Sequence, residues 1–371
     1  MQEASVFRFA VGTLTRSTSY FERAEGDGIS IVEFNGADGQ FSVISTTAGI
    51  DNPTHLCFDH TRKALYANSE VEGWNEGTVS AFRLDEATGA LIYLNKQATL
   101  GSIAAHNSLS SSGRHLFVTN YSHDDVHETP RKAMAVFPVR PDGGLDPASG
   151  SVLHEGRGPS EVRQRVPHPH CAMISHDGVV VSVADLGLDR ILHYAFDDMT
   201  GRVKPSPLGA SRLPPASGPR HFVEAQDGST IYVINELAST IAVMRRSPDE
   251  IEWSLIQIAS TLPHGFEGAS LCAAIHLSPD GRHLYGSNRG HDSIAGFAID
   301  AAGGELTPMG WTSTGGRTPR SFLISADGYY VIVANQNENE IVAFARDPRT
   351  GSLEGTDAKL AIGTPMCVTN I

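Results

Sequence analysis

The segment "AAIHLSPDGRHLYGSNRGHDSIAGFAIDAAGGEL" (residues 273–306) contains the pattern that decides the fold. A short apolar run meets an Asp-Gly turn at Asp280, a β-rich run follows and ends at Asn288, and a third alternating run ends in a glycine-rich turn. Short alternating runs between closely spaced turn signals are typical of antiparallel strands. The segment therefore predicts several strands joined by tight turns.

The same pattern recurs along the chain. Three further copies cover residues 169–203, 219–251 and 319–353, and weaker copies cover residues 53–91 and 104–145, the latter with an insertion around His127. The turn aspartates of the four strong copies recur about every 50 residues, and each is followed eight positions later by Asp or Asn. The aspartates are Asp177, Asp227, Asp280 and Asp327, and the residues that follow them are Asp185, Asn235, Asn288 and Asn335.

An incomplete copy opens the chain and lacks its first strand, and the last residues, "GTPMCVTNI" (363–371), supply a strand of that kind. Repeats of about 40–50 residues with about four strands each are typical of β-propellers. Pairing of the C-terminal strand with the N-terminal blade closes the ring and removes open sheet edges. We therefore predict an all-β fold, a seven-bladed β-propeller with four-stranded blades, as a single domain over residues 1–371.

Composition excludes several classes of function. A net charge of −14 argues against a nucleic-acid partner, which needs a basic surface. The N-terminal residues lack the pattern of a signal peptide, and no run of 18 apolar residues predicts a membrane partner. The four cysteines form no Cys-x-x-Cys pair and are expected as free thiols in a reducing compartment, which indicates a cytoplasmic protein.

Equivalent positions of the blades gather around the axis of a propeller, so two alignment columns are candidates for a central site. The first column lies seven residues before the turn aspartate, near the start of the innermost strand. It contains Thr54, Ala105, His170, Arg220, Ala273, Arg320 and Met366. The second column follows the Asp or Asn that ends the next strand and contains Glu70, Tyr121, Leu186, Glu236, Arg289 and Gln336.

The repeated Asp and Asn residues are expected to be structural, because their side chains bond to local backbone in turns. The irregular residues His170, Arg220, Glu236 and Arg289 are better functional candidates, because a structural repeat needs the same residue in every blade. The alternative for the charged ones is that buried Arg and Glu pair only to satisfy one another.

The stretch "VPHPHCAMISHDG" (166–178) places His168 and His170 on either side of a proline. Three interpretations remain open: a zinc pair that needs a third ligand such as His221 or Glu236, a structural pair, or a catalytic base with a neighbour. Arginines near His170 favour its neutral form, which suits a general base. The preceding stretch, "EGRGPSEVRQRV" (155–166), is expected to form a loop over one face of the ring.

Motifs of serine hydrolases, nucleotide-binding loops and zinc proteases are absent from the sequence. A neutral histidine, arginines that stabilise an anion and a carboxylate that orients a water match acyl chemistry on a small anionic compound. This chemistry needs no metal ion and no organic cofactor.

The pieces "HCAMISHDG", "ADLGLDRI", "SGPRHFV", "INELAST", "IHLSPDGRHLYGSNRGHDSIAGF" and "TPRSFLISADGYYVIVANQ" resemble the seven-bladed propeller lactonases, over nearly the whole chain. This family includes a 6-phosphogluconolactonase and the fungal carboxy-cis,cis-muconate lactonizing enzyme. The resemblance implies an axial site of one His, two Arg and one Glu, which fall on His170, Arg220, Arg289 and Glu236.

The resemblance implies a lactonase that hydrolyses 6-phosphogluconolactone to 6-phosphogluconate in the pentose phosphate pathway. In this interpretation His170 is the general base or acid, Arg220 and Arg289 bind the anion and the oxyanion, and Glu236 orients water or His170. The expected substrate-binding residues are His168, Arg320 and Gln336, and the partner is a small anionic lactone or carboxylate. Two alternatives remain: a muconate-type lactonizing cycloisomerase, and a non-catalytic interaction scaffold.

Overall fold

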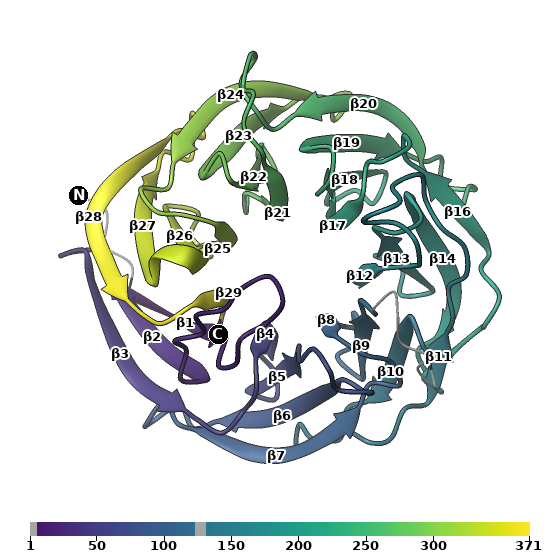
Figure 1. Ribbon diagram of the computed structural model, residues 1–371, viewed down its shortest axis with the longest axis horizontal. Coiled ribbons are helices and arrows are strands. Elements are labelled where there is room, and N and C mark those ends of the chain that lie inside the picture. Colours follow the sequence, from purple (N-terminus) through teal and green to yellow (C-terminus); the bar gives the residue numbers. More distant parts are fainter. Residues whose placement is uncertain (1–5, 123–130) are drawn as a thin grey trace.

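The computed structural model describes residues 6–122 and 131–371, and these residues form a ring of seven antiparallel sheets around a central axis (Figure 1). The predicted seven-bladed, all-β propeller is confirmed. Six sheets have four strands, and the fourth blade carries a short additional strand. The insertion expected around His127 lies outside the described residues.

Each blade runs outward from the axis, from its innermost to its outermost strand (Figure 1). The innermost strands are β29 (Pro365–Asn370), β4 (Pro53–Asp59), β8 (Ala104–Leu109), β12 (Pro169–Ile174), β17 (Pro219–Glu224), β21 (Leu271–Leu277) and β25 (Pro319–Ile324). The second strands are β1 (Val6–Thr13), β5 (Ala64–Ser69), β9 (His115–Asn120), β13 (Val180–Asp185), β18 (Thr230–Asn235), β22 (His283–Arg289) and β26 (Tyr330–Asn335).

The outermost strand of each blade is more exposed than the strands inside it. The third strands are β2 (Ile29–Asn35), β6 (Thr78–Leu84), β10 (Met134–Pro138), β14 (Arg190–Asp197), β19 (Thr240–Arg245), β23 (Ser293–Ile299) and β27 (Glu340–Arg346). The outermost strands are β3 (Gln40–Thr47), β7 (Leu91–Ala98), β11 (Gly150–Val152), β16 (Gly209–Arg212) with the short β15 (Arg202–Val203), β20 (Ser254–Ser260), β24 (Leu306–Ser313) and β28 (Leu353–Ala361).

The ring closes as predicted, through the two ends of the chain. The C-terminal β29 pairs antiparallel with β1 and becomes the innermost strand of the first blade, with Val368 opposite Val11. Side chains from both strands, Phe9, Val11 and Val368, pack in one cluster with Ile332 of the seventh blade. Closure therefore joins the first and last blades by backbone hydrogen bonds and by apolar contact.

The hydrophobic core lies between blades. In the described part of the chain, seven apolar clusters each join two neighbouring blades. Alternation explains this arrangement, because successive side chains of a strand point to opposite faces of its sheet and each face meets the next blade. Between the fifth and sixth blades, for example, Tyr232 and Ile234 pack with Leu284 and Phe297.

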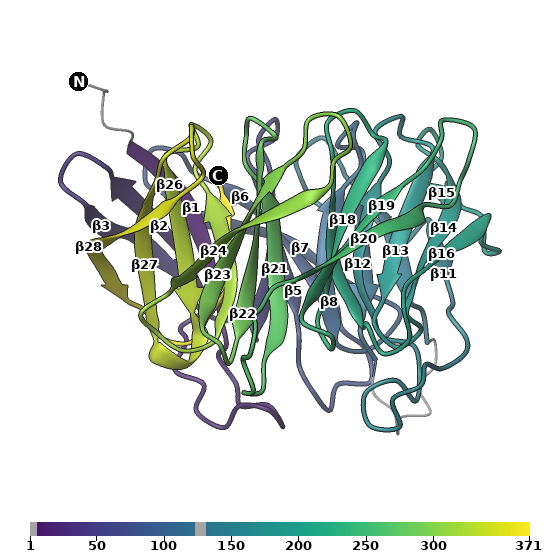
Figure 2. The ribbon, with the colours of Figure 1, turned by 90° about the horizontal axis from the view of Figure 1, so that it is seen from above.

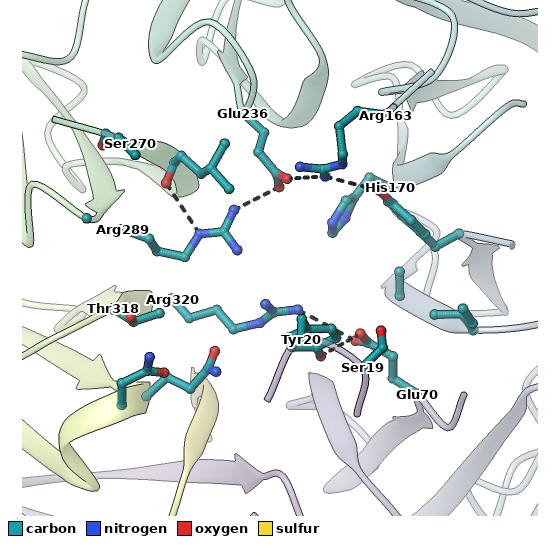
Figure 3. Close-up of a pocket in the computed structure, with 18 of the residues that line it drawn as sticks. Ser19, Tyr20, Glu70, Arg163, His170, Glu236, Ser270, Arg289, Thr318 and Arg320 are labelled. Atoms are coloured by element: carbon teal, nitrogen blue, oxygen red, sulfur yellow. Dashed lines mark hydrogen bonds and ion pairs between the residues drawn. The ribbon is translucent and has the colours of Figure 1, made fainter. Parts of the chain in front are cut away.

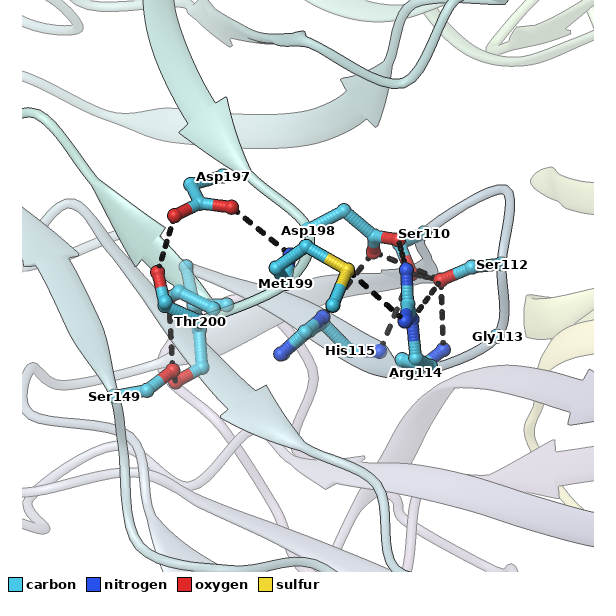
Figure 4. Close-up of polar contacts among 12 residues, drawn as sticks. Ser110, Ser112, Gly113, Arg114, His115, Ser149, Asp197, Asp198, Met199 and Thr200 are labelled. Atoms are coloured by element: carbon cyan, nitrogen blue, oxygen red, sulfur yellow. Dashed lines mark hydrogen bonds and ion pairs between the residues drawn. The ribbon is translucent and has the colours of Figure 1, made fainter.

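Polar contacts join blades at the end of the ring that holds the β8–β9 turn. Between the third and fourth blades, Asp198 accepts hydrogen bonds from the Ser112 hydroxyl and the Arg114 guanidinium (Figure 4). The nearby Ser149 hydroxyl donates to the Gly201 carbonyl at 2.8 Å. These contacts lie in hairpin turns, so they fix neighbouring blades without occupying the axis of the ring.

A β-bulge in every innermost strand positions the candidate site. In each of the seven strands, one extra residue breaks the register with the second strand, and the bulge contains the residue of the first alignment column. Bulges bend a strand and redirect a side chain. The predicted register of the first column is therefore confirmed, including the copies that align weakly.

The edge-on view shows the blades as a thick disc with long loops at the end near η1 (Figure 2). Within the described residues the helical content is limited to η1 (Gln336–Glu338), and no helix there is long and apolar enough to cross a membrane.

Candidate active site

The starts of the innermost strands and the ends of the second strands meet at one end of the ring, because the two strands are antiparallel. At this end the structure contains a cavity of about 660 Å³ (Figure 3). Both alignment columns contribute to it. The lining residues that concern its chemistry are Tyr20, Glu70, Tyr121, Arg163, His170, Glu236, Arg289, Arg320 and Gln336.

Glu236 is the centre of one half of the cavity. Its carboxylate is buried and forms ion pairs with Arg163 at 2.7 Å, Arg289 at 2.8 Å and Arg220 at 3.2 Å. Burial alone raises the pKa of this carboxyl, but the three guanidinium groups outweigh burial and hold the pKa well below its usual range. Glu236 is therefore ionised at neutral pH and fixes the positions of three arginines.

Arg289 presents part of its guanidinium to the cavity. Its Nη2 donates to the Cys272 carbonyl at 2.8 Å and pairs with Glu236. The following Gly290 has φ of 108°, and a Cβ there would clash with the Ala269 carbonyl, so the turn behind Arg289 requires glycine. The "SNRG" sequence thus holds the arginine at the cavity wall.

Arg220 lies below the cavity and is absent from its lining. Its Nη1 donates to the Ala273 carbonyl at 2.7 Å, and the side chain is 5% exposed. Burial, together with the charges of Arg289 and Arg320, lowers the pKa of Arg220 to about 9. The group stays charged at neutral pH, where it supports Glu236 and acts on the histidines around it.

His170 occupies the bulge of β12 and lines the cavity. Its Nδ1 is enclosed and has no hydrogen-bond partner in the described part of the chain. Burial, followed by the positive charge of Arg220, lowers the pKa of His170 well below its usual value. The imidazole is therefore neutral at physiological pH, as predicted from the nearby arginines, and one of its ring nitrogens carries a lone pair that can accept a proton.

Three further histidines lie near His170, and sequence analysis considered only His221 among them, as a possible zinc ligand. Ring centroids are 5.2 Å apart for His170 and His221, 5.2 Å for His106 and His221, and 4.2 Å for His55 and His106. Burial and Arg220 lower the pKa of His55 to about 3. Across the described residues, no group of three or more His, Cys, Asp or Glu is placed to hold a metal ion.

His168 is placed differently from the prediction. It was expected to contact substrate, but it is absent from the cavity lining. Its ring stacks on Tyr121 with centroids 4.3 Å apart, and its Nδ1 lies 2.9 Å from the Tyr121 carbonyl oxygen. His168 precedes β12, whereas His170 occupies the bulge of that strand. His168 therefore supports Tyr121, which lines the cavity.

The opposite half of the cavity is built on Glu70. The Tyr20 hydroxyl donates to Oε1 of Glu70 at 3.0 Å, and the Thr54 hydroxyl donates to Oε2 at 2.6 Å. Arg320 lies 3.7 Å from the same carboxylate and against the ring of Tyr20. Gln336, just after β26, also lines this half.

Sequence analysis missed Tyr20 as a site residue and did not select Arg163 among the arginines of its loop. Arg163 reaches Glu236 and the Tyr121 hydroxyl, whereas Arg157 and Arg165 are exposed. Tyr20 and Arg163 belong to connecting segments, which lie outside the repeated register. The aromatic side chain in the long β1–β2 connection was the available signal for Tyr20.

Comparisons with known proteins agree with this architecture. The family model "Lactonase, 7-bladed beta-propeller" matches residues 8–370. The chain is 32% identical to a 6-phosphogluconolactonase of Bacillus subtilis, over 96% of each chain, and 30% identical to one of Formosa agariphila, over 93% of this chain and 95% of the relative. A solved structure of a Pseudomonas aeruginosa periplasmic gluconolactonase superposes with a TM-score of 0.88 at 31% identity and 99% coverage of both chains. The chain belongs to the lactonase family of seven-bladed β-propellers.

Proposed function

We propose that the protein is a lactonase that hydrolyses 6-phosphogluconolactone to 6-phosphogluconate with its own side chains. The observation that carries the proposal is a neutral, buried histidine at the wall of a cationic cavity. Four guanidinium groups in and directly below the cavity outnumber the carboxylates of Glu70, Glu72 and Glu236, although the protein as a whole has a net charge of −14. Such a cavity attracts a small anion to an acidic protein. The names of the bacterial relatives supply the lactone.

His170 supplies the general base. Its neutral imidazole accepts a proton from a water molecule as the water oxygen attacks the lactone carbonyl carbon. Arg289 stabilises the oxyanion of the tetrahedral intermediate, because a guanidinium fixed by Glu236 needs little reorganisation when the charge develops. The ring C–O bond then breaks, the ring oxygen takes the proton from His170, and the new carboxylic acid ionises to solvent.

The structure changes the role proposed for Arg220. It was expected to bind the substrate anion, but it lies below the lining of the cavity and bonds to protein groups. Its proposed roles are to hold Glu236 and to keep His170 neutral. Glu236 in turn holds the three arginines through its ion pairs with them, and it is not proposed as a proton acceptor.

The test compares lactone disappearance with spontaneous hydrolysis, using the wild type, His170→Ala and the matched control His176→Ala. His176 is an exposed residue of the adjacent turn. We expect His170→Ala to lower kcat by about 10²–10⁴-fold, the usual contribution of a general base, and His176→Ala to retain activity. A wild-type rate equal to the background, or full activity in His170→Ala, contradicts the proposal. A carboxymuconate incubated in parallel tests the cycloisomerase alternative.

The cytoplasm is the proposed compartment. All four cysteines are free thiols, as expected in a reducing environment. The related Pseudomonas protein is described as periplasmic, so cell fractionation is the direct test. Recovery of the protein in the periplasmic fraction would overturn this part of the proposal.

A further inference from the structure

The arginines of the cavity differ in how far their hydrogen-bonding capacity is used. Arg163, Arg220 and Arg289 each bond to Glu236, to backbone carbonyls or to both. Arg320 makes no hydrogen bond within the described residues, although its side chain is only 11% exposed. A guanidinium carries five N–H donors, and the Arg320 guanidinium lines the cavity, where a ligand can reach it. These donors are therefore available to an anionic ligand.

Glu70 does not meet this need. Its two carboxylate oxygens accept hydrogen bonds from the Tyr20 and Thr54 hydroxyls, and Arg320 stands 3.7 Å away, beyond hydrogen-bond distance. The guanidinium carbon of Arg320 lies 5.7 Å from the centroid of the Tyr20 ring, an arrangement in which the ring fixes the plane of the guanidinium. Glu70 and Tyr20 therefore orient Arg320 and leave its donors available.

Gln336 provides a second unused polar group on the same blade. It follows β26, and Arg320 follows Pro319, which pairs with Asn335 across β25 and β26. The Gln336 side chain is 3% exposed, and its Oε1 has no hydrogen-bond partner in the part of the chain that the structure describes. An amide oxygen accepts hydrogen bonds, so Gln336 offers this part of the cavity an acceptor for a substrate hydroxyl, beside the donors of Arg320.

The position of Arg320 separates it from the reacting centre. Arg289 and Arg320 extend into the cavity side by side, but Arg289 ends at Glu236 beside His170, whereas Arg320 ends at Glu70 and Tyr20 (Figure 3). A substrate whose carbonyl lies between His170 and Arg289 would place its other end towards Arg320.

We propose that Arg320 forms the specificity-determining subsite that binds the phosphate of the lactone substrate. This inference rests on the proposed function for the identity of the lactone. Arg320 matches a phosphate dianion because the planar guanidinium can bond two phosphate oxygens at once. The subsite therefore selects phosphorylated over unphosphorylated lactones, and the other half of the cavity performs the hydrolysis.

The test is the ratio of kcat/KM for 6-phosphogluconolactone to kcat/KM for gluconolactone. For Arg320→Met we expect this ratio to fall about 100-fold, the size of effect seen when one partner of a buried charge pair is removed, mainly through KM of the phosphorylated substrate. Arg320→Lys, which keeps the charge but not the fork, should give an intermediate ratio. Arg317→Met is the matched control, because Arg317 lies on the same blade with its side chain 67% exposed.

Equal losses for both lactones in a folded Arg320→Met protein, or an unchanged ratio, would overturn the subsite. Calorimetric measurement of inorganic phosphate binding distinguishes failure of the Arg320 subsite from failure of the proposed function. If the wild type accelerates the hydrolysis of neither lactone, the proposed function is wrong. The subsite is then tested by binding alone: the wild type and Arg317→Met should bind phosphate, and Arg320→Met should not. Absence of phosphate binding to the wild type, or equally tight binding of acetate, would also overturn the assignment.

Discussion

At the scale of single residues, the site depends on how charges control the protonation of His170. The positive charge of Arg220 and the burial of the ring both disfavour the imidazolium. His170 therefore stays unprotonated at pH values where an exposed histidine is largely charged. A base of this kind keeps activity in mildly acidic solution.

This control predicts the pH profile of an Arg220→Gln variant. Loss of the guanidinium removes the charge that disfavours the imidazolium, so the pKa of His170 rises towards 6.5 and the acidic limb of kcat/KM moves to higher pH. The measurement is kcat/KM for gluconolactone from pH 5 to 7, because the phosphate of the other substrate titrates in this range.

Arg317→Gln, with the same charge change at an exposed position, should keep the wild-type profile. An Arg220→Gln profile that coincides with the wild type in shape, at whatever amplitude, would show that Arg220 does not control the protonation of His170.

At the scale of the elements, the repeat made much of the site predictable. A fixed offset from each turn aspartate locates the bulge of the innermost strand, and residues in the bulge point to the axis. His170, Arg220 and Arg320 were therefore identifiable as neighbours although they are distant in the chain. The repeated residue that ends each second strand is structural, as predicted; the Asn288 side chain, for example, donates to the Thr261 carbonyl at 2.7 Å.

The connecting segments were not predictable in the same way. Tyr20 and Arg163 reach the cavity from loops that differ in length and sequence from blade to blade, so no column gives their position. His168 shows the limit within the repeat itself. It is two residues from His170, but only the bulged residue turns into the cavity, and alternation along a regular strand would have placed both on one face.

The closure strand allows a direct test at this scale. Val368 of β29 is 5% exposed within the cluster that joins the first and last blades. Val368→Asp would bury an unpaired carboxylate where the ring closes, so we expect a loss of at least about 3 kcal/mol in the free energy of unfolding. Urea denaturation measures it. Val6→Asp on the paired strand β1 is the control, because Val6 is 56% exposed, and equal stability of the two variants would contradict the role of the closure.

At the scale of the whole molecule, the seven blades place ionisable groups in a channel from which water is largely excluded. His106 and His170 are buried there, His55 and His276 are partly buried, and desolvation lowers the pKa of each, to about 3 for His55 and about 4 for His276. These histidines are therefore neutral in the folded propeller near neutral pH, and they gain a proton more readily when the chain unfolds. This property belongs to the assembled propeller, because no single blade encloses its own column residues.

Stability of the propeller should consequently fall in mild acid. The pKa of His55 is about 3 in the folded protein and about 6.5 when unfolded, so between these values the unfolded chain binds more protons and is favoured as the pH falls. The stabilisation is lost as the pH falls through about 6.5 towards 3, and the titration of His55 removes about 2 kcal/mol of unfolding free energy between pH 7 and pH 5. His55→Gln should reduce the drop in unfolding free energy over this range by about that amount in urea titrations at both pH values.

His60→Gln, at an exposed position of the same blade, should leave the drop in unfolding free energy unchanged. If His55→Gln and the wild type lose equal stability between pH 7 and pH 5, the acid sensitivity arises elsewhere than in the channel histidines.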